Sequence, residues 1–135
     1  MAEDFPEVVF DFEKLDVYKE TEKAVARILE SLSRWPVKYR WLTAQMGSAA
    51  ASVQLNIAEG NGRETAADKS HFMRIAQGSV NECVANLSMA RRLGLMDDEA
   101  VREIRSRFHR VVQMLSALIR KLKGGDSKKM GFSES

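Results

Sequence analysis

The sequence predicts an all-α protein folded as an antiparallel up-down four-helix bundle. Apolar residues recur at helical spacing in four long segments, the links between these segments are short, and the chain has only two prolines. Short links place successive long helices side by side in opposite directions. A chain of 135 residues is also near the commonest size for one domain and should bury about two-thirds of its unfolded surface.

Residues 1–15 are expected to form an extended arm ahead of the bundle, which should span residues 16–123. The apolar side chains of the arm follow no helical spacing. They are numerous enough to predict that the arm packs against another surface. These apolar residues are Phe5, Pro6, Val8, Val9, Phe10 and Phe12.

The first two helices are expected over residues 16–33 and 37–59. Pro36 cannot lie inside a helix but fits its first turn, so a tight link should precede the second helix. Gly60 and the residues after it tolerate positive φ, which a helix C-terminus needs, and they are predicted to end that helix. The first helix carries small or apolar residues about one turn apart, at Val17, Thr21, Ala24, Ile28, Leu29 and Leu32.

The third helix should run from Thr65 to Leu93. Thr65 is a good N-cap, with Asp68 in the place where a capping box usually has Glu or Gln, and Gly94 supplies the stop.

Asp97 is the expected N-cap of the fourth helix, which has the most regular apolar spacing of the four. Gly124 and Gly125 are predicted to end it, and residues 124–135 are too poor in apolar groups to order themselves. The apolar positions step alternately by three and four residues, at Val101, Ile104, Phe108, Val111, Leu115, Leu118 and Leu122.

Polar residues form a stripe along one side of the second helix and a similar stripe along the third. Antiparallel neighbours could bring the two stripes together as a hydrogen-bonded layer that fixes helix register or a subunit contact. A ligand or nucleic-acid contact is the alternative function for these residues. The stripes consist of Ser52, Asn56 and Glu59 on the second helix and Ser79, Glu82 and Asn86 on the third.

These motifs resemble those of the four-helix-bundle proteins encoded in intervening sequences of bacterial 23S ribosomal RNA genes, the S23 family. The resemblance covers roughly residues 10–122 and implies a four-helix bundle that assembles as a ring-shaped homopentamer. The matching segments are residues 12–19, Trp35-Pro36, residues 42–46, Ser52 to Gly60, Phe72 to Glu82, and Leu93-Gly94-Leu95. Relatives commonly carry two arginines where this chain has Gly47 and Ser48, a difference that weakens the case for nucleic-acid binding.

Basic residues crowd the later part of the chain. Residues 1–33 contain 9 acidic and 4 basic groups, whereas residues 34–135 contain 10 acidic and 17 basic groups. An arginine-rich outer face on the fourth helix favours phosphate binding, although such faces also arise simply from solvation. The candidate nucleic-acid-binding residues are Arg91, Arg92, Arg102, Arg105, Arg107, Arg110, Arg120 and Lys123.

The sequence argues against several other classes of function. Cys83 is the single cysteine, which excludes an internal disulfide, and no apolar run approaches the roughly 20 residues that cross a bilayer. We therefore expect a cytoplasmic protein with no membrane partner. Asp68 and His71 have the spacing of half a di-iron motif, but the remaining Glu and His residues of such a motif are missing. No metal, cofactor or catalytic residue is predicted.

Two functional hypotheses follow. The first is a non-enzymatic homo-oligomeric bundle that presents a basic surface to RNA or DNA as an accessory protein. The competing hypothesis is a protein-binding scaffold that does not contact nucleic acid. The salt dependence of binding distinguishes the two hypotheses. Affinity for phosphates falls steeply as the salt concentration rises, whereas the affinity of docking through an apolar surface does not.

Overall fold

The computed structural model describes residues 3–129 of the chain, and within that range it contains helices and no strand. Four α-helices make up the bundle, and two short 3-10 helices precede α1 and α2. The elements are η1 (Asp11–Lys14), α1 (Asp16–Leu32), η2 (Val37–Tyr39), α2 (Arg40–Asn61), α3 (Ala66–Arg92) and α4 (Asp98–Lys129).

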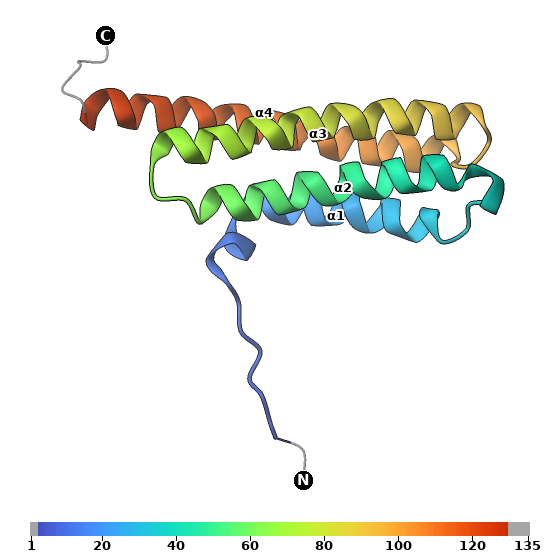
Figure 1. Cartoon of the computed structure of the whole chain (residues 1–135), viewed down its shortest axis with the longest axis horizontal. Coiled ribbons are helices and arrows are strands. Elements are labelled where there is room, and N and C mark those ends of the chain that lie inside the picture. Colours follow the sequence, from blue (N-terminus) through green and yellow to red (C-terminus); the bar gives the residue numbers. More distant parts are fainter. Residues whose placement is uncertain (1–2, 130–135) are drawn as a thin grey trace.

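The four helices form a square in which each contacts only its two neighbours. Within residues 3–129, close backbone contacts join α1 to α2, α2 to α3, α3 to α4 and α4 back to α1, and none joins α1 to α3 or α2 to α4. Successive helices run in opposite directions (Figure 1). The prediction of an up-down four-helix bundle is therefore confirmed.

One apolar core fills the space between the helices. Its largest fully buried side chains include Phe108, Ile28, Leu42, Met46 and Leu115. Two further positions predicted from the spacing along the fourth helix, Ile104 and Val111, are also buried, as are Val53, Ile57, Ala76, Cys83 and Leu87.

Leu118, one of the regularly spaced apolar residues of the fourth helix, is only half-buried, and so is Phe72. Both lie toward the bundle end at which α3 begins, where fewer neighbours surround a side chain. The Arg63 guanidinium covers the Phe72 ring at 4.6 Å from its centroid, and Leu118 lines an open groove.

The predicted caps of α3 and α4 are formed. Thr65 Oγ1 accepts a hydrogen bond from the Asp68 backbone N–H at 3.1 Å, and Asp97 Oδ1 accepts one from Ala100 N–H at 2.8 Å. Gly94 follows α3 with φ of 75°, the left-handed conformation that ends many helices.

The end of α2 differs from the prediction. The helix continues to Asn61, and its C-cap Gly62 has φ of −82°, so positive φ is not what ends it. Gly60 instead permits close packing of α2 on α3. A Cβ at this position would lie 2.9 Å from Cβ of Phe72.

The C-terminal boundary also differs. We expected α4 to end at Gly124, but it continues through both glycines to Lys129. A glycine inside a helix costs only about 1 kcal/mol relative to alanine, and lysines in a last turn interact favourably with the helix dipole. The remainder of the expected tail, residues 130–135, lies outside the described residues.

Residues 3–10 have no regular secondary structure and extend from the bundle, but residues 11–14 of the expected arm form the 3-10 helix η1. The arm points away from the bundle (Figure 1). Its apolar side chains Phe5, Val8, Val9 and Phe10 are exposed, so the described part of the chain leaves most of their surface uncovered.

Candidate nucleic-acid interface

One hydrogen bond joins the polar stripes of α2 and α3, and a third residue, Asn56, supports it from within α2. Ser52 Oγ and Ser79 Oγ share a hydrogen bond of 2.7 Å. Asn56 Nδ2 donates to the Ser52 carbonyl oxygen at 2.8 Å and to Ser52 Oγ at 3.0 Å. This small layer links α2 to α3 at one register, since a shift of either helix would separate the two serines.

The two carboxylates do not join that layer. Glu59 and Glu82 are both exposed, and Glu59 Oε1 accepts a hydrogen bond from Arg63 Nη2 at 2.6 Å. The expectation that all six polar residues point inward is thus corrected for these two. A buried carboxylate needs a partner, and exposure avoids that cost. Asn86 is buried and lines a groove between α2 and α3.

An ion-pair network joins α1 to α4 and includes two of the candidate phosphate-binding arginines. Arg107 Nη1 lies 3.1 Å from Oε1 of Glu20, and Arg107 Nε lies 3.1 Å from Oε2 of Glu103. Arg110 Nη1 approaches Glu20 at 3.4 Å, while Arg27 Nε binds Glu103 Oε1 at 3.1 Å. Only 11% of the Glu20 side chain is exposed.

The network shifts the pKa values of Glu103 and Arg107. The hydrogen bond from Arg107 lowers the pKa of Glu103, and burial opposes that shift. The same bond raises the pKa of Arg107, with Glu20 adding to the effect. The charges of Arg107 and Arg110 are therefore partly compensated inside the protein. Sequence reasoning missed the network because its α1 members lie far from α4 in the chain.

The other basic residues of α4 form a separate stripe. At 100° per residue, Arg102, Arg105, Arg120 and Lys123 fall within about 60° of one another around the helix. All four side chains are exposed. The salt bridges of the described residues involve none of them. We call these four residues the basic stripe.

A groove between α3 and α4 lies beside this stripe. It has a volume of about 530 Å³ and is lined by Arg105, His109 and Asn81 together with apolar residues such as Val84 and Val112. Arg91 and Arg92 end α3 in its last turn. The chain has no Asp or Glu over residues 83–96 or 104–125. Cations and neutral hydrogen-bonding groups therefore dominate most of the α3–α4 face, as phosphate binding requires.

A family model, described as the 23S rRNA-intervening sequence protein, matches residues 13–117. The chain belongs to this family. A similar solved structure is the crystal structure of a protein of unknown function from the S23 ribosomal protein family of Bacteroides thetaiotaomicron. Its TM-score is 0.67, at 19% identity over 76% of this chain and 97% of that one, which shows a common fold. No curated protein matches the chain.

In this member of the 23S rRNA-intervening sequence family, Gly47 and Ser48 face different surroundings. Gly47 is half-buried, and a Cβ there would lie 3.7 Å from Cδ1 of Leu32 on α1. Ser48 is exposed and lines the α2–α3 groove that Asn86 also lines. Neither residue adds charge to the α3–α4 face.

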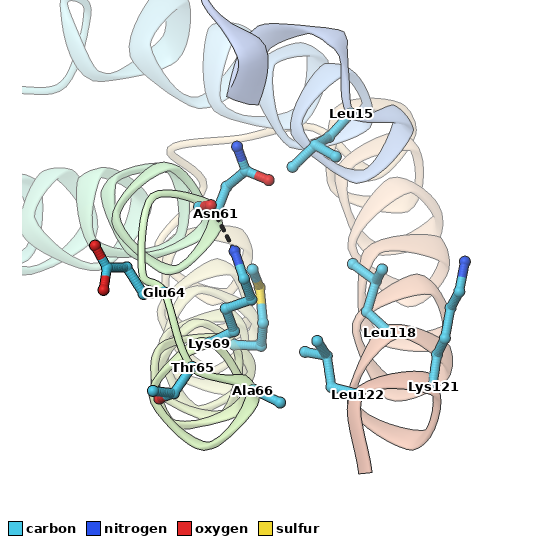
Figure 2. A pocket seen from close by; sticks show the side chains of 10 residues that line it. Leu15, Asn61, Glu64, Thr65, Ala66, Lys69, Leu118, Lys121 and Leu122 are labelled. Atoms are coloured by element: carbon cyan, nitrogen blue, oxygen red, sulfur yellow. Dashed lines mark hydrogen bonds between the residues drawn. The ribbon is translucent and has the colours of Figure 1, made fainter. Parts of the chain in front are cut away.

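A second groove, which we call the end groove, lies where α1 and α3 begin and α4 nears its end (Figure 2). It measures about 530 Å³. Leu118 and Leu122 of α4 face Lys69 of α3 across it, and Leu15 borders it from the start of α1. Lys69 Nζ donates a hydrogen bond to the Asn61 carbonyl oxygen at 2.7 Å, which holds the ammonium group at the rim.

Among residues 3–129, no cluster of three or more His, Cys, Asp or Glu side chains is arranged to hold a metal ion. Burial raises the pKa of the Cys83 thiol to about 12, with nearby Glu82 adding to the effect, so the thiolate is scarce at neutral pH. None of the described helices is long and apolar enough to cross a membrane.

Proposed function

We propose that this family member is a non-enzymatic RNA-binding accessory protein that acts as a cytoplasmic homo-oligomer. The basic stripe carries the proposal. Its four cations are exposed, make no salt bridge with the side chains of residues 3–124, and adjoin long stretches without carboxylates. Such a surface raises the local concentration of a polyanion and releases counter-ions when phosphates bind.

The dimensions of the stripe suit an extended phosphate backbone. From Arg102 to Lys123 a helix rises about 30 Å, at about 1.5 Å per residue. The neighbouring groove offers Asn81, Arg105 and His109 as hydrogen-bonding groups for sugars or bases. Most of the affinity would come from phosphates, so we expect little dependence on RNA sequence.

Self-association completes the proposal. A single basic stripe binds phosphate weakly, whereas several copies in one assembly act together and can raise avidity by about 10²-fold or more. The ring of five that the family resemblance implies would present five stripes. Equilibrium sedimentation at micromolar concentration should give a mass several times that of one chain. A monomer under those conditions contradicts this part of the proposal.

The test of RNA binding is a fluorescence titration with single-stranded RNA at several salt concentrations. The variant replaces Arg102, Arg105 and Arg120 by Gln. The control replaces the same number of exposed cations on other faces, Lys19, Lys23 and Lys38, by Gln. Affinity of the wild type should fall linearly on a log-log plot with salt, and the stripe variant should lower that slope by about 0.7 for each lost phosphate contact. Equal effects of both variants would refute a specific role for the stripe.

A protein-binding scaffold is the second candidate function. Large apolar side chains are exposed on α2 and α3, at Trp41, Leu55, Ile75 and Met89. Such residues could dock another protein. In that case Trp41→Ser and Leu55→Ser should abolish capture of the partner, and binding should persist at high salt. RNA binding that disappears with the stripe variant favours the first candidate instead.

A further inference from the structure

We propose that residues 3–10, the arm, dock in the end groove of a second copy of this chain. The inference deepens the proposed function, because it rests on the self-association proposed above and assigns the surfaces that produce it. Four observations support the docking of the arm: the exposure of the arm, its fixed direction, the apolar walls of the end groove, and the acidic residues of the arm opposite the lysines of the groove.

The arm exposes far more apolar surface than an isolated chain should. Phe5 is 76% exposed and Phe10 is 61% exposed, and both valines between them are more than half exposed. Contiguous apolar surface of this kind is typical of an interface. Pro6 removes one backbone donor, which disfavours pairing of the arm as a strand in a sheet and leaves side-chain docking as the natural mode.

The root of the arm is held in place and directs the arm away from its own bundle. Phe10 N–H donates to Glu13 Oε1 at 2.9 Å, and the Phe12 ring packs edge-on against Tyr18 with 4.9 Å between centroids. The residues beyond this root extend outward (Figure 1). Eight extended residues span about 26 Å, at about 3.3 Å each, which is far enough to reach a neighbouring bundle.

The end groove offers the complementary surface. Its walls are the apolar side chains of Leu15, Met73, Leu118 and Leu122, and its volume of about 530 Å³ can take bulky apolar side chains. Figure 2 shows the two α4 leucines facing into this space, and both are half-buried. An aromatic side chain from the arm would replace water against these walls.

Charge separates the end groove from the α2–α3 groove. The arm carries Glu3, Asp4 and Glu7 and no basic residue over residues 3–10. Two lysines, Lys69 and Lys121, and one carboxylate, Glu64, line the end groove, whereas the charged residue of the α2–α3 groove is Glu82. Apolar and acidic residues of the arm therefore match a groove with leucine walls and a lysine rim.

Cysteine cross-linking of the full-length protein tests the proposal. One protein carries Val9→Cys and a differently tagged protein carries Leu122→Cys; the two are mixed and oxidised. We expect a disulfide-linked pair containing both tags. The control pairs Val9→Cys with Leu55→Cys, which is exposed on α2, and should give at least tenfold less product. Equal yields from both mixtures, or none from either, overturn the proposal.

A chain carrying both Val9→Cys and Leu122→Cys identifies the occupant of the groove. If the arm reaches a second copy, the oxidised product should contain two or more linked chains under denaturing, non-reducing conditions. An internal disulfide within one chain would mean that the arm folds back on its own groove, which also overturns the proposal.

Charge reversal gives an independent measurement. Glu7→Lys and Lys121→Glu should each reduce the mass measured by light scattering, and mixing the two variants should restore it. If the wild type is oligomeric and neither change alters its mass, the arm proposal fails while self-association stands. If the wild type is monomeric yet binds RNA, self-association and the arm proposal fail together, and the basic stripe is unaffected.

Discussion

At the scale of single residues, the environment of a side chain decides its role more than its chemical type does. Arg102 and Arg107 both lie on α4, five residues apart. Arg102 is exposed, while Arg107 bonds to carboxylates from α1 and α4. Only residues of the first kind remain free to bind a polyanion.

Glu20 should contribute measurably to stability because it is nearly buried and accepts hydrogen bonds from two arginines. Glu20→Ala should lower the free energy of unfolding by about 1–3 kcal/mol, since a partly buried Arg107 would lose one of its two partners. Glu30→Ala is the control, because exposed ion pairs contribute little, and its effect should stay below about 0.5 kcal/mol. Urea denaturation measures both. Equal losses would mean that the α1–α4 network is unimportant.

The same network should make stability depend on pH. The folded pKa of Glu103 is lowered from 4.5, mainly by its hydrogen bond from Arg107. A lowered folded pKa contributes stability that is present above pH 4.5 and is lost as pH falls through the folded value. The melting temperature should therefore drop less between pH 5 and about pH 3 in Glu103→Gln than in wild type. Parallel curves for the two proteins would contradict this assignment.

Two helical glycines should respond in opposite ways to alanine. At Gly60 a new Cβ would lie 2.9 Å from Phe72 Cβ and 3.4 Å from the Lys69 carbonyl oxygen, so Gly60→Ala should destabilise by about 1–3 kcal/mol. At Gly78 nothing lies within 4 Å of the added carbon, so Gly78→Ala should stabilise by up to about 1 kcal/mol. Thermal unfolding compares the pair. Stabilisation by both changes would show that α2 and α3 are not tightly packed at Gly60.

At the scale of elements, periodicity and caps were enough to predict four helices but not all of their ends. Thr65, Gly94 and Asp97 act locally, so their roles could be predicted from the sequence alone. The end of α2 could not be predicted in this way, because Gly60 allows close packing against α3 and does not form a turn. The end of α4 was also misplaced, since a glycine pair disfavours a helix without forbidding it.

The candidate site was less predictable than the elements for a related reason. Helical spacing assigns each residue to a face, but it does not say which neighbouring helix that face meets. The pairing of Ser52 with Ser79 required only that α2 and α3 be antiparallel neighbours. To predict the ion pair between Glu20 and Arg107, one must know how α1 packs on α4, and no local signal in the sequence specifies that packing.

The core face of α4 should dominate the stability of the bundle. Leu115 is fully buried, and Leu115→Ala should cost about 2–5 kcal/mol through lost contacts and the cavity left behind. Leu55→Ala removes the same atoms from a side chain that is 66% exposed, and it should cost less than about 0.5 kcal/mol. Chemical denaturation distinguishes them. A small effect at Leu115 would mean that the register of α4 in the core is wrong.

At the scale of the whole molecule, the acidic and basic parts of the chain have different proposed partners. The acidic arm projects away from the bundle, and the basic stripe lies on α4 (Figure 1). If the arms hold the copies together, the acidic N-terminal residues are buried in the interfaces between copies, and the basic faces stay accessible. Assembly would then both concentrate the cations and remove the carboxylates that compete with RNA.

Deletion of residues 3–9 separates assembly from simple electrostatics. The deletion removes three acidic residues and no basic one, so each chain becomes more positive. Charge alone therefore predicts tighter RNA binding. Avidity predicts weaker binding instead, because each isolated bundle presents only one stripe. We expect the affinity for RNA to fall by about 10²-fold or more. The circular dichroism spectrum and the cooperativity of unfolding should stay unchanged, which would show that the bundle still folds. Tighter binding by the deleted chain, together with an unchanged mass, would show that the arm hinders RNA binding instead of supporting it.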